Sequence, residues 1–284
     1  MSHNLFETFA AKMRERAEAD FITTRDGRRY RYADALTISA QLAGALTELG
    51  VKQGDRVAVQ VDKSPEAILL YLACLRIGGV YLPLNTGYTG DEIRYFLNDA
   101  EPALFVCRPK IEEQALSLAA ETGCPAVVTL GSAADGSLME TAQAAVPRED
   151  IVALGERDLA AILYTSGTTG KPKGVMRDTG GYAVALAYSM QAIYAMEPGE
   201  VFFTASDVGW VVGHSYIVYA PLLLGCTTVV YEGKPVKTPD AGSFWRLIEE
   251  YRVKSFFTAP TAFRAIKKED PEGKLLQNYD ISSL

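Results

Sequence analysis

Short β-prone runs alternate with amphipathic helical patterns along this chain, and that alternation constrains its fold more than any other feature. Strands that alternate with helices predict largely parallel sheets with helices on both faces, so the sequence predicts an α/β fold. The expected strands cover residues 56–61, 80–84, 103–107, 126–130, 159–163, 201–205, 227–231 and 255–258. The expected helices cover residues 4–18, 36–49, 64–78, 89–98, 111–121, 181–195, 214–224, 242–251 and 261–268.

Local signals support several of these boundaries. Asp26-Gly27 lies between two β-prone runs and predicts a hairpin, because both turn residues must tolerate positive φ. Ser64 and Pro65 predict a helix start, and Thr89 with Glu92 forms a capping-box pattern. Residues 133–150 contain breakers and an acidic pair, and we expect them to form a surface excursion. No linker long enough to separate two independent domains is apparent.

The stretch Tyr164–Gly174 reads Tyr-Thr-Ser-Gly-Thr-Thr-Gly-Lys-Pro-Lys-Gly and directly follows the apolar run 159–163. A buried strand is therefore expected to deliver a donor-rich loop to one edge of a sheet. Glycines let backbone N–H groups converge on an anion, hydroxyls add donors, and lysines add positive charge. This composition predicts a loop that binds a polyphosphate.

This stretch has two other possible interpretations. The P-loop of kinases and GTPases needs Gly where Thr165 stands and a hydroxyl residue where Pro172 follows Lys171, so that motif is excluded. A solvated linker is the ordinary interpretation of a Ser/Thr/Gly cluster. A linker seldom follows directly on a strand pattern, which favours the phosphate loop.

A second informative segment is Ala205–Tyr216, which reads Ala-Ser-Asp-Val-Gly-Trp-Val-Val-Gly-His-Ser-Tyr. The glycines on either side of Trp210-Val211-Val212 permit close approach of a ligand or of neighbouring backbone. In the ordinary interpretation, Trp210 and the valines belong to the core and His214 only begins a helix. The position of the segment after an expected strand end favours a binding site, because ligands of such sheets sit beyond the carboxyl ends of strands.

Tyr164–Gly174 resembles the signature loop of the adenylate-forming enzymes, which include the acyl-CoA synthetases. Residues 177–284 resemble acetyl- and propionyl-CoA synthetases at 177–182, 205–216, 231–235 and 258–264, whereas residues 1–175 resemble malonyl-CoA synthetases. The resemblance implies a partial AMP-binding large domain over residues 1–284, with two interleaved α/β lobes. It also implies that several of the family's groups lie outside this chain: the adenine-contacting segment, the magnesium-binding glutamate, the ribose-binding aspartate, and the small C-terminal domain with its catalytic lysine.

The resemblance implies an acid–thiol ligase that makes acyl-CoA from a carboxylate, ATP and CoA through an acyl-adenylate, with Mg²⁺ as a further cofactor. Valine at 212, where acetyl-type enzymes have Thr, favours propionate, with acetate next. The implied phosphate-binding residues are Thr165, Ser166, Gly167, Thr168, Thr169, Gly170, Lys171 and Lys173. The implied acyl-site residues are Trp210, Val211, Val212, His214, Thr258 and Pro260, with Lys173 and His214 as the catalytic pair and no metal ligand in this chain.

Two alternatives remain open at the level of the sequence. A malonyl-CoA synthetase would need a cation for the second carboxylate, and Arg264 is the better candidate, with Arg177 weaker. In the other alternative, the chain is a catalytically inactive nucleotide-binding fragment. ATP titration would distinguish this fragment from an enzyme, because the fragment would bind without turnover.

Composition excludes several other classes of function. The net charge of −7 over 284 residues leaves no electrostatic footprint for nucleic acid. Cys74, Cys107, Cys124 and Cys226 show no metal-binding spacing and are expected to be reduced. No apolar run approaches the length of a membrane span. These features predict a cytoplasmic protein whose partners are small molecules, and they predict no particular oligomeric state.

Overall fold

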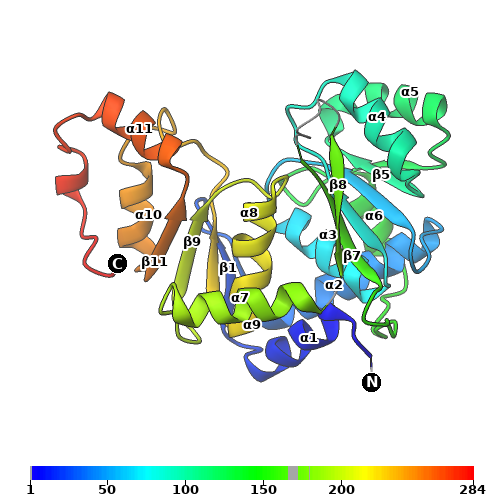
Figure 1. Cartoon of the computed structure of the whole chain (residues 1–284), viewed down its shortest axis with the longest axis horizontal. Coiled ribbons are helices and arrows are strands. Elements are labelled where there is room, and N and C mark those ends of the chain that lie inside the picture. Colours follow the sequence, from blue (N-terminus) through cyan, green and yellow to red (C-terminus); the bar gives the residue numbers. More distant parts are fainter. Residues whose placement is uncertain (1, 166–171, 179) are drawn as a thin grey trace.

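The computed structural model describes residues 2–165, 172–178 and 180–284, and among these residues two sheets are flanked by helices (Figure 1). The strands are β1 (Asp20–Thr24), β2 (Arg29–Arg31), β3 (Arg56–Gln60), β4 (Val80–Pro83), β5 (Leu104–Cys107), β6 (Val127–Thr129), β7 (Leu159–Thr165), β8 (Lys173–Asp178), β9 (Val201–Ala205), β10 (Thr227–Val230) and β11 (Ser255–Thr258). The helices are α1 (Leu5–Glu15), α2 (Tyr32–Glu48), α3 (Pro65–Arg76), α4 (Gly90–Ala100), η1 (Pro109–Ile111), α5 (Glu112–Thr122), α6 (Ser137–Ala144), α7 (Gly181–Ala192), α8 (Val211–Gly213), η2 (His214–Tyr219), α9 (Ala220–Leu224), α10 (Ser243–Tyr251), α11 (Pro260–Glu269) and η3 (Leu276–Asn278).

The strand order confirms the predicted α/β fold. One sheet has the order β11-β9-β10-β1-β2 and the other has the order β6-β5-β3-β4-β7-β8. Neighbouring strands are parallel except for the pairs β1/β2 and β7/β8, which are antiparallel. Parallel strands place their carboxyl ends at one edge of a sheet, where α/β proteins bind ligands.

The first sheet is assembled from two distant parts of the chain. Its strand β1 pairs with β10, about 200 residues later, and Ile22 lies opposite Thr228. The hydroxyl of Thr227 donates to the Asp20 carbonyl at 2.6 Å, and the hydroxyl of Tyr32 donates to the Cys226 carbonyl at 2.7 Å. The second sheet lies in sequence between these two parts, so the two sheets interleave along the chain.

Helix α3 lies in the core, and every one of its residues is buried. The Ser64 hydroxyl accepts a hydrogen bond from the Ala67 amide, and Pro65 occupies the first turn, so both predicted start signals are confirmed. A helix that is apolar on all sides must be covered on all sides, and α3 belongs to a core cluster that includes Phe21 and Val57, one from each sheet. The predicted capping box of Thr89 and Glu92 is likewise confirmed at α4.

Residues 133–150 are not merely a surface excursion, and this prediction was wrong. They contain α6, whose Leu138 is completely buried, and the chain after it packs closely against α2. A Cβ at Gly44 of α2 would lie 2.3 Å from the Val146 carbonyl oxygen, and the Arg148 amide donates to the Ala40 carbonyl at 2.9 Å. Helix α6 is short and has few apolar side chains, and it lies between the helix-breaking residues Gly136 and Pro147. Its helical pattern is therefore hard to recognise in the sequence.

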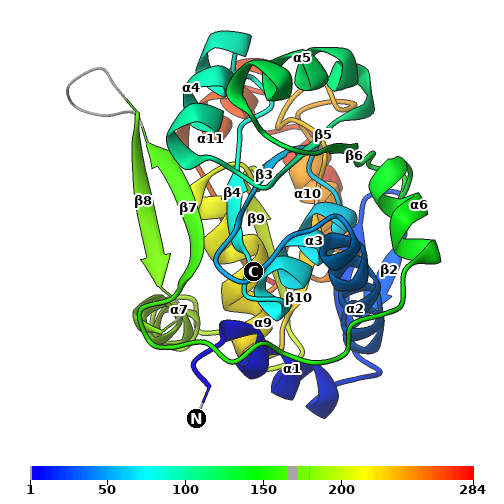
Figure 2. The same cartoon turned by 90° about the vertical axis from the view of Figure 1, so that its right-hand side faces the viewer.

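The end of the predicted phosphate loop also differs from expectation. Lys173 and Gly174 begin β8, which pairs antiparallel with β7 at the edge of the second sheet (Figure 2). The sequence pattern predicts no strand between this loop and α7. Every residue of β8 except Arg177 is exposed, and its apolar side chains, Val175 and Met176, are adjacent in sequence, so the strand lacks the apolar alternation that identifies a half-buried strand. Among the described helices, none is long and apolar enough to cross a bilayer.

Candidate functional site

The carboxyl ends of strands from both sheets meet at residues 206–213, which follow β9. The Lys63 ammonium, just beyond β3, donates to the Ser206 carbonyl at 2.7 Å. A Cβ at Gly209 would lie 3.3 Å from the Cα of Asn85, which follows β4. The Gln60 amide group in turn donates to the Asn85 carbonyl at 2.9 Å. Segment 206–213 therefore bridges the two sheets at the edge where ligands of α/β proteins bind.

Lys63 is a member of this site that the sequence analysis missed. Burial lowers the pKa of Lys63 to about 8, and the charges of Asp207 and Glu232 offset part of that effect. A single lysine between a strand and a helix start carries no distinctive sequence signal. Its partner Ser206 lies 143 positions later in the chain, so only the tertiary fold brings the two together.

Both glycines of segment 206–213 lie close to neighbouring backbone, and Gly213 is the more tightly constrained of the two. The Asp207 carboxylate accepts from the Gly209 amide at 2.8 Å, and the Asp207 carbonyl accepts from the Trp210 amide at 3.1 Å. A Cβ at Gly213 would lie 1.9 Å from the carbonyl oxygen of Asp207, a distance that no side chain tolerates. The segment is thus a tight turn that leads into α8 and presents Trp210 and Val212 beyond the strand ends.

The predicted acyl-site residues differ in their exposure. Trp210 is 48% exposed and Val212 is 39% exposed, so both can contact a small molecule. Val211 is half-buried and packs against the main core cluster. Other large apolar side chains of the chain are exposed as well, such as Val184 and Tyr188 of α7, but Trp210 and Val212 lie beyond the carboxyl ends of strands, where ligands of α/β proteins bind.

His214, predicted as catalytic and acyl-binding, lies in the core directly behind that surface. It is 1% exposed, and its Nδ1 lies 3.0 Å from the Tyr219 hydroxyl. The rings of Tyr71 and Tyr81 each have centroids 5.4 Å from the imidazole. Its Nε2 has no hydrogen-bond partner among the residues described. Burial, followed by the positive charge of Arg177, lowers the pKa of His214 to about 3, so the ring is neutral at physiological pH.

The predicted phosphate loop is framed by described residues at both ends. Thr165 ends β7 and lies opposite Lys173, the exposed first residue of β8, so the loop leaves and re-enters the sheet at paired positions. The predicted residues Ser166, Gly167, Thr168, Thr169, Gly170 and Lys171 lie outside the described residues. Helix α4 holds both flanks: the Tyr164 hydroxyl donates to the Asp99 carboxylate, and the Tyr95 hydroxyl donates to the Pro172 carbonyl at 3.2 Å.

The remaining predicted residues lie at the carboxyl end of β11. Thr258 pairs with Ala205 across the sheet, and its hydroxyl lies 3.4 Å from the Ala205 carbonyl. Pro260 is the exposed first residue of α11. Arg264, the better cation candidate for a second carboxylate, is exposed. Arg177 is half-buried, and its guanidinium carbon lies 3.9 Å from the centroid of the Tyr182 ring.

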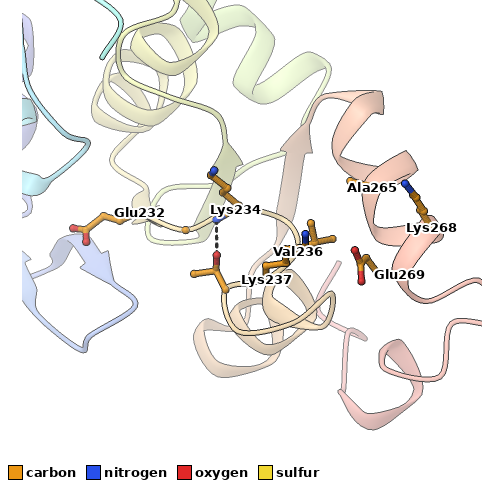
Figure 3. A pocket seen from close by; sticks show the side chains of 9 residues that line it. Glu232, Lys234, Val236, Lys237, Ala265, Lys268 and Glu269 are labelled. Atoms are coloured by element: carbon orange, nitrogen blue, oxygen red, sulfur yellow. Dashed lines mark hydrogen bonds between the residues drawn. The ribbon is translucent and has the colours of Figure 1, made fainter. Parts of the chain in front are cut away.

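A separate surface pocket of about 580 Å³ lies between the loop after β10 and α11 (Figure 3). Lysines and glutamates both contribute to its lining, which gives it no single electrostatic preference. Its lining residues are Glu232, Gly233, Lys234, Val236, Lys237, Thr238, Ala265, Lys268 and Glu269. None of these residues belongs to the predicted site. Among the described residues no cluster of three or more His, Cys, Asp and Glu side chains is arranged to hold a metal.

Comparison with known proteins establishes the family. The sequence profile described as AMP-binding enzyme matches residues 6–284. The chain belongs to the AMP-binding enzyme family. Its relatives within the family include a mouse protein named acyl-CoA synthetase short-chain family member 3, mitochondrial, at 43% identity over 272 residues. Propionate–CoA ligase of Salmonella typhimurium is 43% identical over 267 residues.

A solved structure of the family has the same fold. ATP-bound MatB from Rhodopseudomonas palustris superimposes with a TM-score of 0.87 at 31% identity, over 98% of this chain and 54% of that one. The matches cover 88% of this chain and 40% of the mouse protein, and 86% of this chain and 42% of the Salmonella protein. The chain therefore spans less than half the length of these two relatives.

Proposed function

We propose that residues 1–284 form the acid- and triphosphate-holding part of a short-chain acyl-CoA synthetase. The observation that carries this proposal is the exposed pair Trp210 and Val212, held beyond the carboxyl ends of both sheets by Lys63 and Gly209. The 43% identity to a propionate–CoA ligase supports the same function. Propionate is the favoured acid and acetate the next, and the cytoplasm is the proposed compartment.

The proposed reaction has two steps. A carboxylate oxygen of the acid attacks the α-phosphorus of ATP, the bond to the bridging oxygen breaks, and pyrophosphate leaves. The thiolate of CoA then attacks the acyl carbonyl carbon, and AMP leaves with the former carboxylate oxygen. Segment 165–171 and Lys173 are assigned to the polyphosphate, where oriented amides and positive charge stabilise the negative charge on the leaving pyrophosphate.

The acyl group is assigned to the surface made by Trp210, Val211 and Val212. An alkyl chain of one or two carbons gains little from any one contact, so selectivity between acetate and propionate rests on small differences in apolar area. One methylene is worth about 1–3 kcal/mol in such a pocket. Val212 offers more apolar area than Thr would, which favours the longer acid. Thr258 and Pro260 are assigned to the rim of this site, and His214 to its buried backing.

The proposal is tested in a chimaera that joins residues 1–284 to the C-terminal part of the Salmonella propionate–CoA ligase. ATP–pyrophosphate exchange is measured with acetate, propionate, butyrate and malonate. We expect the fastest exchange with propionate, and we expect Val212→Thr to shift the propionate-to-acetate ratio roughly tenfold toward acetate. Val184→Thr, at an exposed position of α7, is the matched control and should leave the ratio unchanged.

Three outcomes would contradict the proposal. Exchange with malonate alone would favour a malonyl-CoA synthetase, in which Arg264, or less readily the half-buried Arg177, would pair with the second carboxylate. ATP binding without exchange with any of the four acids would favour an inactive nucleotide-binding fragment. Failure to bind ATP would reject the assignment of the phosphate loop itself.

A further inference from the structure

A chain of side-chain contacts connects β8 to the backbone of the acyl-site segment. Arg177 of β8 stacks on the ring of Tyr182 in α7 at 3.9 Å. The Tyr182 hydroxyl is hydrogen-bonded to the Ser215 hydroxyl in η2. The Ser215 hydroxyl in turn donates to the Val211 carbonyl at 2.6 Å. We call Arg177, Tyr182, Ser215 and the Val211 carbonyl the β8 relay.

The direction of each hydrogen bond in the β8 relay follows from counting protons. A serine hydroxyl has one hydrogen, and that of Ser215 is used on the Val211 carbonyl. Tyr182 must therefore donate its own hydrogen to the Ser215 oxygen. Ser215 is 3% exposed, so water does not replace either partner. Losing the Tyr182 hydroxyl would leave a buried serine oxygen with one acceptor site unfilled, which weakens the hold on Val211.

The relay begins on the strand that carries a predicted phosphate-binding residue. Lys173 and Arg177 both lie on β8, which is paired with β7 from Thr165 to Leu159. The relay ends on the carbonyl of Val211, next to the exposed Val212. Strand β8 is thus connected to both ends of the proposed reaction site. It directly follows the predicted phosphate loop in sequence, and it reaches the acyl end through α7 and η2.

We propose that Tyr182 and Ser215 are positioning residues that set the acyl-site wall, Val211 and Val212, relative to the strand leaving the phosphate loop. The proposal deepens the proposed function, because it concerns the placement of the same acyl site. The reacting carboxylate must be placed to within a fraction of an ångström of its productive position relative to the attacked phosphorus. The wall that holds the acid must therefore keep a fixed position relative to the phosphate-binding strand.

A simpler explanation exists for one contact of the β8 relay. Serine in a helix often donates to the carbonyl four residues earlier, and that local bond alone would account for the Ser215–Val211 contact. Under that explanation Tyr182 is incidental. Tyr182→Phe distinguishes the positioning role from this local explanation. The variant keeps the hydrogen bond from Ser215 to the Val211 carbonyl but removes the Tyr182 hydroxyl that donates to Ser215.

The matched control is a second tyrosine–serine pair between the same two helices. The Tyr216 hydroxyl donates to the Ser189 hydroxyl of α7 at 3.2 Å. This pair resembles the Tyr182–Ser215 pair in chemistry, but neither of its hydroxyls is bonded to segment 206–213. Tyr216→Phe therefore removes a comparable hydroxyl without touching the relay.

The first measurement is amide hydrogen exchange of segment 206–216 in the intact chain without substrate. The His214 amide donates to the Trp210 carbonyl at 3.1 Å, so its exchange reports opening of the turn. We expect Tyr182→Phe and Ser215→Ala to speed this exchange about fivefold, Ser215→Thr to retain slow exchange, and Tyr216→Phe to leave it unchanged. Equal effects of Tyr182→Phe and Tyr216→Phe, or no effect of Tyr182→Phe, would overturn the proposal.

The second measurement uses the chimaera described above. We expect Tyr182→Phe to raise KM for propionate about fivefold while KM for ATP changes less than twofold, because the relay acts on the acyl wall. Equal rises in both values would contradict a positioning role at the acyl site. The exchange measurement needs no catalysis, so an inactive chimaera would reject the proposed function and still leave the relay decided by the first measurement.

Discussion

The hydroxyl of Tyr95 in α4 donates a hydrogen bond to the backbone oxygen of Pro172 over 3.2 Å, directly before β8 begins. At the other flank of the predicted phosphate loop, the carboxylate of Asp99 in the same helix accepts a hydrogen bond from the Tyr164 hydroxyl. Helix α4 therefore acts as a support for both ends of that loop, although it contributes no predicted ligand contact of its own.

Tyr95→Phe should weaken ATP binding, because the Pro172 carbonyl loses its side-chain donor and the flank of the loop loses its anchor. One neutral hydrogen bond is worth about 1 kcal/mol, so we expect the dissociation constant to rise about fivefold in calorimetric titration of the intact chain. Tyr88→Phe is the control: its ring packs 4.9 Å from that of Phe96, and its hydroxyl makes no hydrogen bond within the described part of the chain. Equal affinities for the Tyr95 variant and wild type would show that α4 does not support the loop.

Gly213→Ala should destabilise the protein, although glycine-to-alanine changes at helical positions usually stabilise. Gly213 has helical dihedral angles of −62° and −48°, so alanine suits its backbone. The added methyl group, however, would lie 1.9 Å from the Asp207 carbonyl oxygen. We expect the free energy of unfolding in urea to fall by about 2–3 kcal/mol, the upper part of the range for overpacking, because the methyl group meets backbone.

Gly180→Ala serves as the control for this change, because a Cβ at Gly180 meets no atom within 4 Å. Its free energy of unfolding should stay within about 0.5 kcal/mol of wild type. A Gly213→Ala protein that is as stable as wild type would mean that the turn from Asp207 to Gly213 relaxes freely.

His214 should make stability fall as the pH drops below about 6.5. Its folded pKa is depressed to about 3 by burial, while the unfolded chain has a histidine pKa of about 6.5. Between these values the unfolded state binds a proton that the folded state does not, so acid favours unfolding. The free energy of unfolding should therefore be about 2 kcal/mol lower at pH 5 than at pH 8 because of this group.

The measurement is urea unfolding of wild type and His214→Gln at pH values from 5 to 8. His214→Gln should flatten this dependence, even if it lowers the stability at every pH. His3→Gln changes the only other histidine in the sequence, at a half-exposed position, and should keep the wild-type slope. Parallel curves for wild type and His214→Gln would contradict a neutral, buried imidazole.

Tyr30→Phe should destabilise the junction between the β1/β2 hairpin and α3. The Tyr30 hydroxyl donates to the buried Glu66 carboxylate at 2.6 Å, beside an Arg28–Glu66 ion pair at 3.2 Å. Removing a donor to a buried charged group costs about 1.5–3 kcal/mol, which urea unfolding would detect. Tyr188→Phe, at a 70% exposed position of α7, should cost less than about 0.5 kcal/mol. Similar losses for the two variants would argue against a special role for Tyr30.

Local rules predicted most elements because their signals lie within a few residues. Ser64-Pro65 and Thr89-x-x-Glu92 specify helix starts through caps that any such segment can form. The edge strand β8 and the short helix α6 escaped prediction, since β8 depends on its pairing with β7 and the burial of α6 depends on its packing against α2. Periodicity is informative only where one face of an element is apolar, and the side chains of β8 are not arranged that way.

The sequence by itself determined the α/β class, and its motifs carried the resemblance to the family and the prediction of a phosphate loop, because these signals lie within short stretches of the chain. Only the tertiary structure decided that Lys63 reaches Ser206, that His214 is a buried neutral base, and that Arg177 is connected through Tyr182 to Val211. The physical reason is that burial and electrostatic environment depend on which distant segments pack together, and no pattern within a short window records that packing.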